Sequence, residues 1–408
     1  MNFDHPQQML PPFYQKVFRA HLSEAQYLTL MLLVMLIQSQ RQIQLSRLAS
    51  AFPQPIQYNS RIRNLQRFLI LPQLSVPLLW FPILKYWLRQ EVQGRGLNRD
   101  QRRHLKKLKR RTGGSLILAL DRTQWKGRNL LMVTVVWGNH ALPVYWEIIP
   151  KDGSSNLSTQ VRLLKRAIKL FTPHPMLVLG DREFHSPKLA QVLSRFKVDF
   201  CLRQKKSVYL KVHDGSYEAV KSMGFGPGMK QFLVDIRVGK RDHIGPFNMA
   251  VYWKRQYRGK GGKEAWYILT SLSNLDATLK FYRARWGIES MFKDCKSGGY
   301  NLARAKVHDP RFLALMLLMV IAYSLATCAG QAFTQIGVDR YVARLKEQER
   351  RYPRHSEFGR GLYGYAWCYG MEIWPDLAEA LMVFLPKRAE RSNHHKIYVV
   401  GSLSSLEV

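Results

Sequence analysis

The order of short apolar runs in the middle of the chain constrains its fold more than any other feature. Five runs have the length and composition of strands, and they span residues 115–120, 130–137, 142–149, 176–179 and 198–202. A Gly138-Asn139 turn predicts that the second and third runs form a hairpin. Helix-like segments separate the last three runs, and Asn156 or Ser158 is expected to cap the first of them. This order predicts an α/β fold with a mixed sheet.

Two of these runs are followed at once by an acidic residue. Asp121 follows the first run, and Asp181 follows the fourth run after Gly180. Their carboxylates are expected to emerge where loops can admit a substrate. Two carboxylates held close together repel unless cations bridge them, and Mg²⁺ is the natural cation because it prefers oxygen ligands. Either aspartate alone is better explained as a helix or turn cap, so the metal site depends on a third acid.

Glu289 supplies that third carboxylate within a Tyr-x2-Arg-x3-Glu-x6-Lys pattern formed by Tyr282, Arg285, Glu289 and Lys296. On one continuous helix these four residues would fall within an arc of roughly 60°. Lys293 would lie close beside them. The pattern therefore predicts a helix face that carries a phenol, a carboxylate and cations. The alternative for Arg285 and Glu289 is a surface ion pair four residues apart.

The chain is strongly basic, with 63 Lys and Arg against 28 Asp and Glu and a formal net charge of +35. A compact fold with this charge would repel itself unless a polyanion were its usual partner. DNA, RNA and an anionic membrane surface remain open on charge alone. The basic run at 101–111 is expected to contact nucleic acid, with a solvated run before a strand as the alternative. The four scattered cysteines indicate reduced thiols in a cytosolic protein.

One segment, residues 312–329, is apolar over a length that could span a bilayer. It contains Tyr323, Ser324 and Thr327, and it follows Glu289 closely, which would place a charged site at the membrane surface. We therefore expect a buried core helix instead of a transmembrane helix. The first eleven residues show no basic region followed by an apolar run, so no secretory signal is expected.

These motifs resemble the DDE transposases of bacterial insertion sequences that carry the Tyr-Arg-Glu-Lys signature. The residues that carry the resemblance are the signature itself, Asp121-Arg122-Thr123 and Asp181-Arg182-Glu183-Phe184. The long separation between the second aspartate and the glutamate is expected when a β-rich insertion splits the catalytic domain, and residues 207–272 fit that insertion. The resemblance covers residues 116–301 with specific motifs.

The resemblance implies an RNase H-like mixed sheet flanked by helices and interrupted by a β-rich insertion, with helical N-terminal and C-terminal regions. It implies that Asp121, Asp181 and Glu289 are catalytic and bind two Mg²⁺ ions, for which Mn²⁺ can substitute. Members of this group nick the transposon ends. The freed 3′-hydroxyl then attacks the opposite strand to form a hairpin, which is reopened before strand transfer.

Hairpin formation requires a base to leave the helix near the cut. The residues that the resemblance assigns to DNA are Tyr282, Arg285, Lys296, Arg182, Trp266 and Lys293. The tyrosine, Arg285 and Lys296 would hold the backbone beside the flipped base. Trp266 would stack on that base, and a core aromatic is its alternative. Arg182 would contact DNA, with Glu183 either paired to it or held as a reserve acid.

Five segments are expected along the chain, and each has its own role. They are residues 1–110, a helical region for binding DNA ends; 111–206, the first part of the catalytic domain; 207–272, the β-rich insertion; 273–335, the second part of the catalytic domain; and 336–408, a region for DNA binding or dimerisation. For the N-terminal region, a helical scaffold with solvated arginines fits equally well.

The expected partner is double-stranded DNA, as terminal inverted repeats and as target. A homodimer on paired ends, no membrane, and a bacterial cytoplasmic location at the nucleoid complete this interpretation. One alternative is an RNase H-like nuclease that cuts without strand transfer, against which the signature and the insertion argue. A second is a catalytically silent DNA-binding relative, although all three acids are present. A peripheral membrane protein would leave the acids without a use.

Overall fold

The computed structural model describes residues 10–93, 114–255, 264–344 and 354–383, apart from residues 126, 138–139, 151–152, 213–214 and 297. The chain divides into two compact units, which are described separately. Unit 1 combines Met1–Tyr86 with Lys293–Val408, and unit 2 comprises Trp87–Phe292. The five segments expected from the sequence stay predictions. The Gly138-Asn139 turn and the basic run at 101–111 lie outside the described residues.

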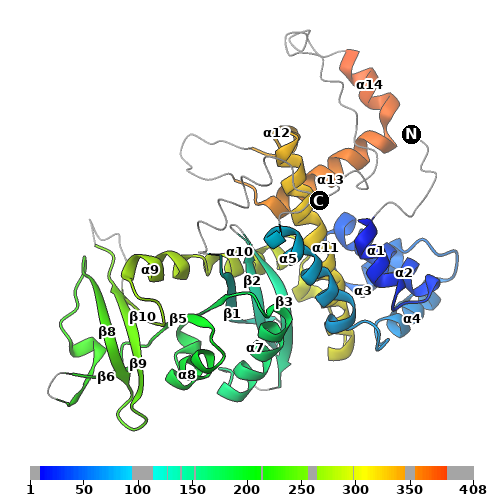
Figure 1. Cartoon of the computed structure of the whole chain (residues 1–408). Coiled ribbons are helices and arrows are strands. Elements are labelled where there is room, and N and C mark those ends of the chain that lie inside the picture. The colour runs from blue at the N-terminus through cyan, green and yellow to red at the C-terminus, as the bar shows by residue number, and fades with distance from the viewer. Residues whose placement is uncertain are drawn as a thin grey trace. The chain divides into compact units, whose positions relative to one another are not determined.

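Unit 2 is built on a ten-stranded mixed sheet with the strand order β3-β2-β1-β4-β5-β10-β9-β8-β6-β7 (Figure 1). The strands are β1 (Leu116–Trp125), β2 (Arg128–Trp137), β3 (His140–Ile149), β4 (Met176–Gly180), β5 (Asp199–Arg203), β6 (Tyr209–Lys211), β7 (Tyr217–Ala219), β8 (Lys230–Val238), β9 (Ile244–Tyr252) and β10 (Trp266–Thr270). The first three are antiparallel neighbours, whereas β4 runs parallel to both β1 and β5. The predicted α/β fold with a mixed sheet is confirmed.

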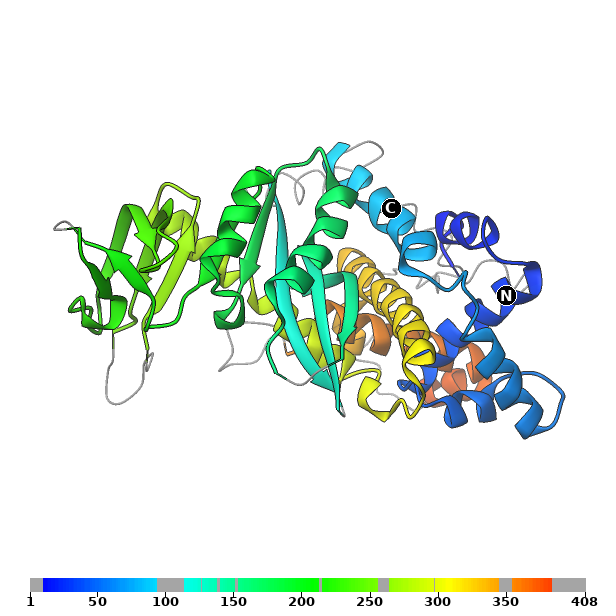
Figure 2. The ribbon, with the colours of Figure 1, turned by 90° about the horizontal axis from the view of Figure 1, so that it is seen from below.

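Helices cover this sheet as the apolar pattern predicts. In the described part of unit 2, the helices are the end of α5 (Phe81–Gln93), α7 (Leu157–Phe171), α8 (Pro187–Arg195), α9 (Leu275–Arg283) and most of α10 (Trp286–Cys295), with short helical turns η3 (Arg182–Phe184) and η4 (Val220–Ser222). The side chain of Asn156 caps α7 by accepting from the Thr159 backbone N–H at 2.9 Å. Helices α7 and α8 contact each other and the sheet, and α9 contacts β5, β8 and β9 (Figure 2). In Figure 1 the sheet lies between α9 and α8.

The predicted β-rich insertion continues the sheet. Strand β10 pairs antiparallel with β5, and Ile268 lies opposite Arg203. Strands β9 and β8 then add to β10, and the short strands β6 and β7 end the sheet. The inserted segment is therefore joined to the strand beside β4 by backbone hydrogen bonds, which fixes its position relative to the acids.

Unit 1 is helical and combines both ends of the chain, as the predicted helical terminal regions require. Its helices are α1 (Pro12–Arg19), α2 (Glu24–Gln40), α3 (Leu45–Ala51), α4 (Tyr58–Phe68), η2 (Val76–Trp80), the first part of α5 (Phe81–Gln93), η5 (Leu302–Arg304), α11 (Asp309–Gln335), α12 (Asp339–Val342), α13 (Glu357–Ile373) and α14 (Pro375–Val383). A capping box starts α2, because Ser23 and Gln26 each accept from the other's backbone N–H.

Helix α11 forms the core of unit 1 and packs against α13 and α2. By length and composition it could cross a membrane, yet 78% of its most apolar window is buried inside the protein. This is the burial that a core helix requires. Helices α11 and α13 approach closely through facing glycines: a Cβ on Gly330 would lie 1.8 Å from the Glu357 carbonyl oxygen, and one on Gly361 would lie 1.7 Å from that of Ala326.

Candidate active site

Neighbouring parallel strands bring Asp121 and Asp181 together. In the β1–β4 pairing Leu120 lies opposite Gly180, so the two aspartates are the next residues along adjacent strands. Gly180 is required here because a Cβ would lie 2.8 Å from the Cβ of the buried Phe184, where the chain turns back after β4. The sequence correctly predicted that Asp181 follows a strand.

The expectation that Asp121 ends its strand is wrong. Strand β1 continues through Trp125 and pairs with β2 as far as Arg128. The reason is that β4 stops at Gly180 while β2 continues, so the β1–β2 hairpin keeps its backbone hydrogen bonds beyond the acid. Asp121 therefore lies inside a strand, at the point where the neighbour on its other side has ended.

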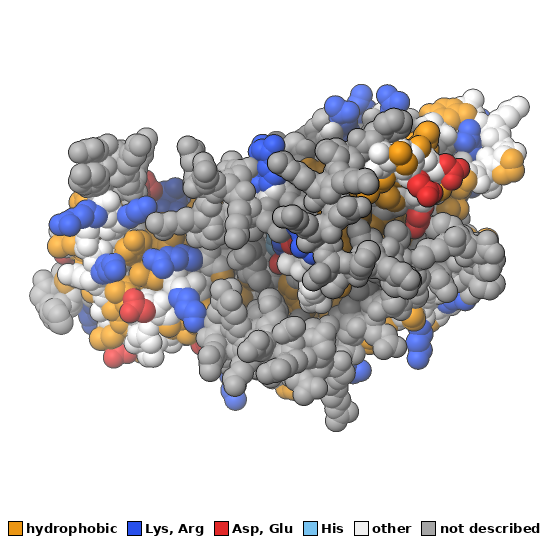
Figure 3. Space-filling view, turned by 90° about the horizontal axis from the view of Figure 1, so that it is seen from above, with side chains coloured by type: hydrophobic (Ala, Val, Ile, Leu, Met, Phe, Trp, Pro, Cys, Tyr) orange, Lys and Arg blue, Asp and Glu red, His pale blue; other side chains and the backbone are white. Residues whose placement is uncertain are grey.

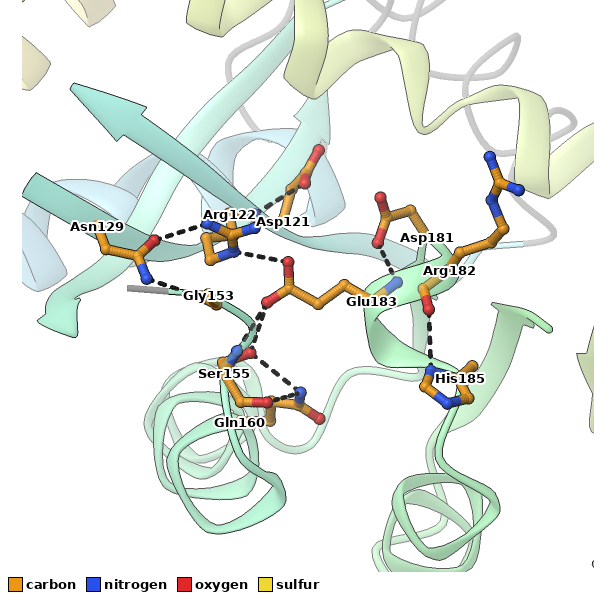
Figure 4. Close-up of polar contacts among 10 residues, drawn as sticks. All are labelled: Asp121, Arg122, Asn129, Gly153, Ser155, Gln160, Asp181, Arg182, Glu183 and His185. Atoms are coloured by element: carbon orange, nitrogen blue, oxygen red, sulfur yellow. Dashed lines mark hydrogen bonds and ion pairs between the residues drawn. The ribbon is translucent and has the colours of Figure 1, made fainter. Parts of the chain in front are cut away.

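Backbone N–H groups orient both carboxylates (Figure 4). Asp121 Oδ1 accepts from the N–H of Arg122 at 2.8 Å, and Asp181 Oδ1 accepts from the N–H of Glu183 at 2.8 Å. Each aspartate thus has one oxygen held by its own segment. The second oxygen of each is directed to the side on which α9 and α10 lie in the close-up.

The pKa of Asp121 is raised to about 7. Burial is the largest cause, followed by repulsion from Asp181, with a smaller contribution from Glu289. The positive charge of Arg285 and the hydrogen bond from the Arg122 backbone oppose this rise. Carboxylates from two other segments of the chain therefore act on Asp121. Their uncompensated negative charge is what a bound cation would relieve.

Arg285 joins two of the three acids. Its Nη1 donates to Asp121 Oδ2 at 3.2 Å, and its Nη2 forms an ion pair with Glu289 Oε1. Among the described residues, no group of three His, Cys, Asp or Glu side chains is placed to hold a metal ion. In donor type and charge, the three carboxylates fit a divalent cation. In this structure the guanidinium of Arg285 lies between two of them, Asp121 and Glu289.

The predicted single helix over Tyr282–Lys296 is wrong. Helix α9 ends at Arg283 and α10 begins at Trp286, so Arg285 lies in the break. Just after the break, Gly287 packs closely on β3: a Cβ there would lie 2.7 Å from the carbonyl oxygen of His140, a contact that helix propensity cannot anticipate. Tyr282, Arg285 and Glu289 therefore do not lie on one continuous helix, although Arg285 still interacts with both Tyr282 and Glu289. The break instead turns Arg285 toward Asp121.

The two lysines of the pattern belong to unit 1. Lys293 is exposed in the last turn of α10, and Lys296 lies in the turn that follows the helix. Their assignment to DNA stays a prediction.

Tyr282 and Trp266 form an aromatic contact in unit 2. Their ring centroids are 5.2 Å apart at an interplanar angle of 71°, and Trp266 also contacts Tyr252. Tyr282 is 3% exposed, and burial raises the pKa of its hydroxyl, while the charges of Arg285 and Arg203 oppose that rise. Trp266 is half-buried. This position of Trp266 is compatible both with stacking on a DNA base and with a role as a core aromatic.

Arg182 and Glu183 do not pair with each other. Arg182 Nη1 donates to Glu264 Oε2 at 2.7 Å on the surface, whereas Glu183 Oε2 accepts from Arg122 Nε at 2.7 Å. The expectation of an Arg182–Glu183 pair is therefore corrected. Sequence reasoning missed Arg122 as a partner, although strand alternation places its side chain on the face opposite to Asp121.

The family model described as "Transposase DDE domain" matches residues 112–325, which is more than half of the chain. A search of the curated proteins found no match. One similar solved structure is the piggyBac transposase synaptic complex with hairpin DNA, at 12% sequence identity and a TM-score of 0.40. That likeness covers 96% of this chain and 85% of the other. At so low a TM-score, no property of piggyBac is transferred to this chain.

Proposed function

The chain belongs to the family of transposases with a DDE domain, and from this premise we propose that it mobilises an insertion sequence. The family consists of enzymes that cleave DNA and transfer strands. The finer proposal is that this chain belongs to the Tyr-Arg-Glu-Lys group. It would cut transposon ends by hydrolysis and join them to target DNA by transesterification, through a hairpin intermediate.

The observation that carries the proposal is that Asp181 and Glu289 both act on Asp121, and that Arg285 links Asp121 to Glu289. Asp121 lies in β1, Asp181 follows β4, and Glu289 lies in α10. Burial of Asp121 beside other acids costs free energy that folding alone would not require. A buried carboxylate whose pKa is raised in this way is typical of functional sites.

We assign the binding of two Mg²⁺ ions, with Mn²⁺ as a substitute, to these three carboxylates. When bound, such ions activate the attacking oxygen and stabilise the leaving oxygen of a phosphodiester. The chain's own contribution is to hold the acids: backbone N–H groups fix one oxygen of each aspartate. Arg285 has to leave the carboxylates, and its guanidinium can then bind a DNA phosphate.

Aromatic and basic side chains beside the acids support the hairpin route. Tyr282 lies near Arg285 and Trp266, so a phenol, a cation and a half-buried indole gather next to the acids. We propose that Tyr282, Arg285 and Lys296 bind the DNA backbone beside a flipped base, and that Trp266 stacks on that base. Lys293 and Arg182 would contact phosphates nearby.

The charge of the chain supports DNA as the partner. Basic residues are exposed throughout the β-rich part of unit 2, and Figure 3 shows such side chains at its left. They include Lys205, Lys206, Lys211, Lys221, Lys230, Arg237, Lys240 and Arg241. We propose that the enzyme acts as a homodimer on paired terminal repeats at the bacterial nucleoid, with the N-terminal helices binding the ends and residues 336–408 binding DNA or the second subunit.

The test uses the full chain and a DNA duplex that carries the short inverted repeats flanking its gene. With Mg²⁺, denaturing gels should show a nick at the transposon end and then a hairpin product. Asp121→Asn, Asp181→Asn and Glu289→Gln should each give neither product, while still binding the end in a gel-shift assay. Normal cleavage by one of these variants would remove that acid from the site. Nicks without hairpin or joined products would favour the nuclease over the transposase.

A further inference from the structure

We propose that Arg122 and Glu183 are positioning residues that hold the carboxylates of Asp121 and Asp181 at a fixed separation. This inference rests on the proposed function, because it concerns how the same two acids are kept ready. Neither residue touches the reacting atoms in this scheme. They act through the backbone and through an ion pair behind the two acids (Figure 4).

The first observation is that each positioning residue orients one acid. The N–H of Arg122 donates to Asp121 Oδ1, and the N–H of Glu183 donates to Asp181 Oδ1, both at 2.8 Å. The orientation of each carboxylate therefore depends on where the backbone of its positioning residue lies. A shift of either backbone would rotate the corresponding acid.

The second observation is that the side chains of these residues meet. Arg122 Nε donates to Glu183 Oε2 at 2.7 Å, and the two side chains are 25% and 13% exposed. Successive side chains of a strand point to opposite faces, so Arg122 extends away from Asp121. The ion pair thus connects β1 to the turn after β4 from the face opposite to the acids.

The third observation is that both ends of the ion pair are anchored. Arg122 Nη1 donates to Asn129 Oδ1 at 2.9 Å, and the Asn129 amide donates to the Gly153 carbonyl at 2.9 Å. Glu183 Oε1 accepts from both the N–H and the hydroxyl of Ser155, each at 2.9 Å. A network in which the charged members have such partners is rigid, and its loss is costly.

The ion pair is placed where the sheet gives no support. The β1–β4 ladder ends at Leu120 and Gly180, so no ladder bond fixes Asp181 to β1. Asp121 and Asp181 repel each other across this gap. An attraction between the residues next to them opposes that repulsion, and it keeps the acids close enough to share a cation.

The same hydrogen bonds bear on two other possible roles, a reserve metal ligand for Glu183 and a DNA contact for Arg122. Both oxygens of Glu183 already accept hydrogen bonds, so binding a metal would compete with these bonds. Arg122 directs Nε and Nη1 to Glu183 and Asn129, so a contact with DNA would fall to Nη2 or require this network to open. A role in DNA binding would therefore weaken DNA affinity on substitution, whereas a positioning role would weaken metal affinity.

The experiment compares wild type with Glu183→Gln, Arg122→Gln and the double variant. Glu183→Gln keeps the shape of the side chain, so it tests the ion pair even where Arg122→Gln lowers stability. The matched control is Arg162→Gln, which breaks the exposed Arg162–Glu147 ion pair in the same unit. For each protein we would measure Mn²⁺ affinity by titration calorimetry, DNA-end affinity without metal by gel shift, thermal unfolding, and the cleavage rate.

We expect both single variants to bind Mn²⁺ roughly 10–100-fold more weakly, as substitutions of residues that support metal ligands do. The double variant should be no weaker than the worse single variant, because both remove the same interaction. Cleavage should recover at high Mn²⁺, and DNA affinity should equal that of wild type. Arg162→Gln should match wild type throughout.

Unchanged Mn²⁺ affinity in folded Glu183→Gln would overturn the inference. Loss of DNA affinity with normal Mn²⁺ affinity would also overturn it, and would make Arg122 a DNA contact. The proposed function can fail on its own. If wild type binds Mn²⁺ with an affinity that depends on Arg122 and Glu183 but cleaves no end DNA, the transposase assignment is wrong and the positioning role stands. If wild type cleaves and the variants match it, only the positioning role is lost.

Discussion

Each unit of the molecule buries an aspartate against an arginine, and the two pairs differ in what surrounds them. In unit 1, Asp339 Oδ2 and Arg360 Nη1 are 3.2 Å apart, and the side chains are 7% and 11% exposed. In unit 2, Asp121 and Arg285 are also 3.2 Å apart, and each is 14% exposed. The first is one acid for one base. In the second, Arg285 contacts two acids, Asp121 and Glu289, and a third acid, Asp181, acts on Asp121.

The charges around a buried ion pair distinguish a structural pair from a functional one. A balanced buried pair can be retained for the fold alone, because each charge satisfies the other. A site with surplus charge is held in place at a cost, and that cost is informative about function. The distance between aspartate and arginine is the same in both pairs and does not distinguish them. The number of additional acids beside the aspartate does.

The two ion pairs should differ most when the aspartate of each pair is neutralised. Asp121→Asn should reduce end cleavage below detection, and the free energy of unfolding should stay within about 1 kcal/mol of wild type because one repelling charge is removed. Asp339→Asn should lower that free energy by about 3 kcal/mol, because it leaves Arg360 buried without its counter-charge. Urea unfolding and gel assays would check both. Equal effects of the two substitutions would erase the distinction.

A second substitution tests whether unit 1 depends on close apolar packing instead of charge. Gly361→Ala should destabilise the protein by about 3 kcal/mol, since its Cβ would lie 1.7 Å from the Ala326 carbonyl oxygen. Gly370→Ala in the same helix is the control, because its Cβ would meet only the Trp374 ring at 3.7 Å. Thermal unfolding that ranks Gly370→Ala as the more harmful change would contradict the packing of α11 against α13.

The signature residues of unit 2 can be tested step by step. Tyr282→Ala and Arg285→Ala should slow hairpin formation roughly 10–100-fold more than the first nick, because they would misplace the flipped strand. Tyr209→Ala, an exposed tyrosine on β6, should leave both steps unchanged. Single-turnover assays on pre-nicked and intact ends separate the two steps. Equal losses in both would argue against the clamp.

The last prediction concerns the pH dependence of stability through a second acid of unit 1. Burial raises the pKa of Asp294 to about 7, although the charge of Lys293 and a hydrogen bond from Ser356 oppose the rise. The folded protein therefore keeps this proton between about pH 4 and 7 while the unfolded chain loses it. Through this group stability falls as pH rises across that window, by up to about 1.4 kcal/mol per pH unit.

Asp294→Asn should remove this part of the pH dependence, and the variant should be more stable than wild type at pH 8. Urea unfolding at pH 5 and pH 8 measures the change. A variant whose stability follows pH as wild type does would show that Asp294 is not the group responsible.

Much of the fold can be predicted from the sequence because its signals are local. The strand runs, the Asn156 cap and the aspartate after β4 depend on residues within a few positions. Departures arise where distant segments decide. Strand β1 continues past Asp121 because of its pairing with β2, and the helix is broken at Arg285, just before Gly287 packs on His140 of β3.

The candidate site likewise combines features set by local sequence with features set by distant segments. The three candidate acids stand out from their positions along the chain, but the partners of the charged residues do not. Glu183 is next to Arg182 in sequence, yet it pairs with Arg122 on another strand. Local pairing rules favour neighbours, and only the register of β1 and β4 shows which side chains share a face. The way both ends of the chain combine in unit 1 likewise depends on non-local packing.

The central claim is that the three carboxylates share a divalent cation in place of Arg285. The most direct test is anomalous diffraction from crystals of the enzyme bound to an end duplex and soaked with Mn²⁺. We predict Mn²⁺ density between Asp121 and Asp181, with Glu289 as a ligand and the guanidinium of Arg285 moved to a DNA phosphate. Crystals of cleavage-competent complex in which Arg285 still bridges Asp121 and Glu289, with Mn²⁺ bound elsewhere, would contradict the account.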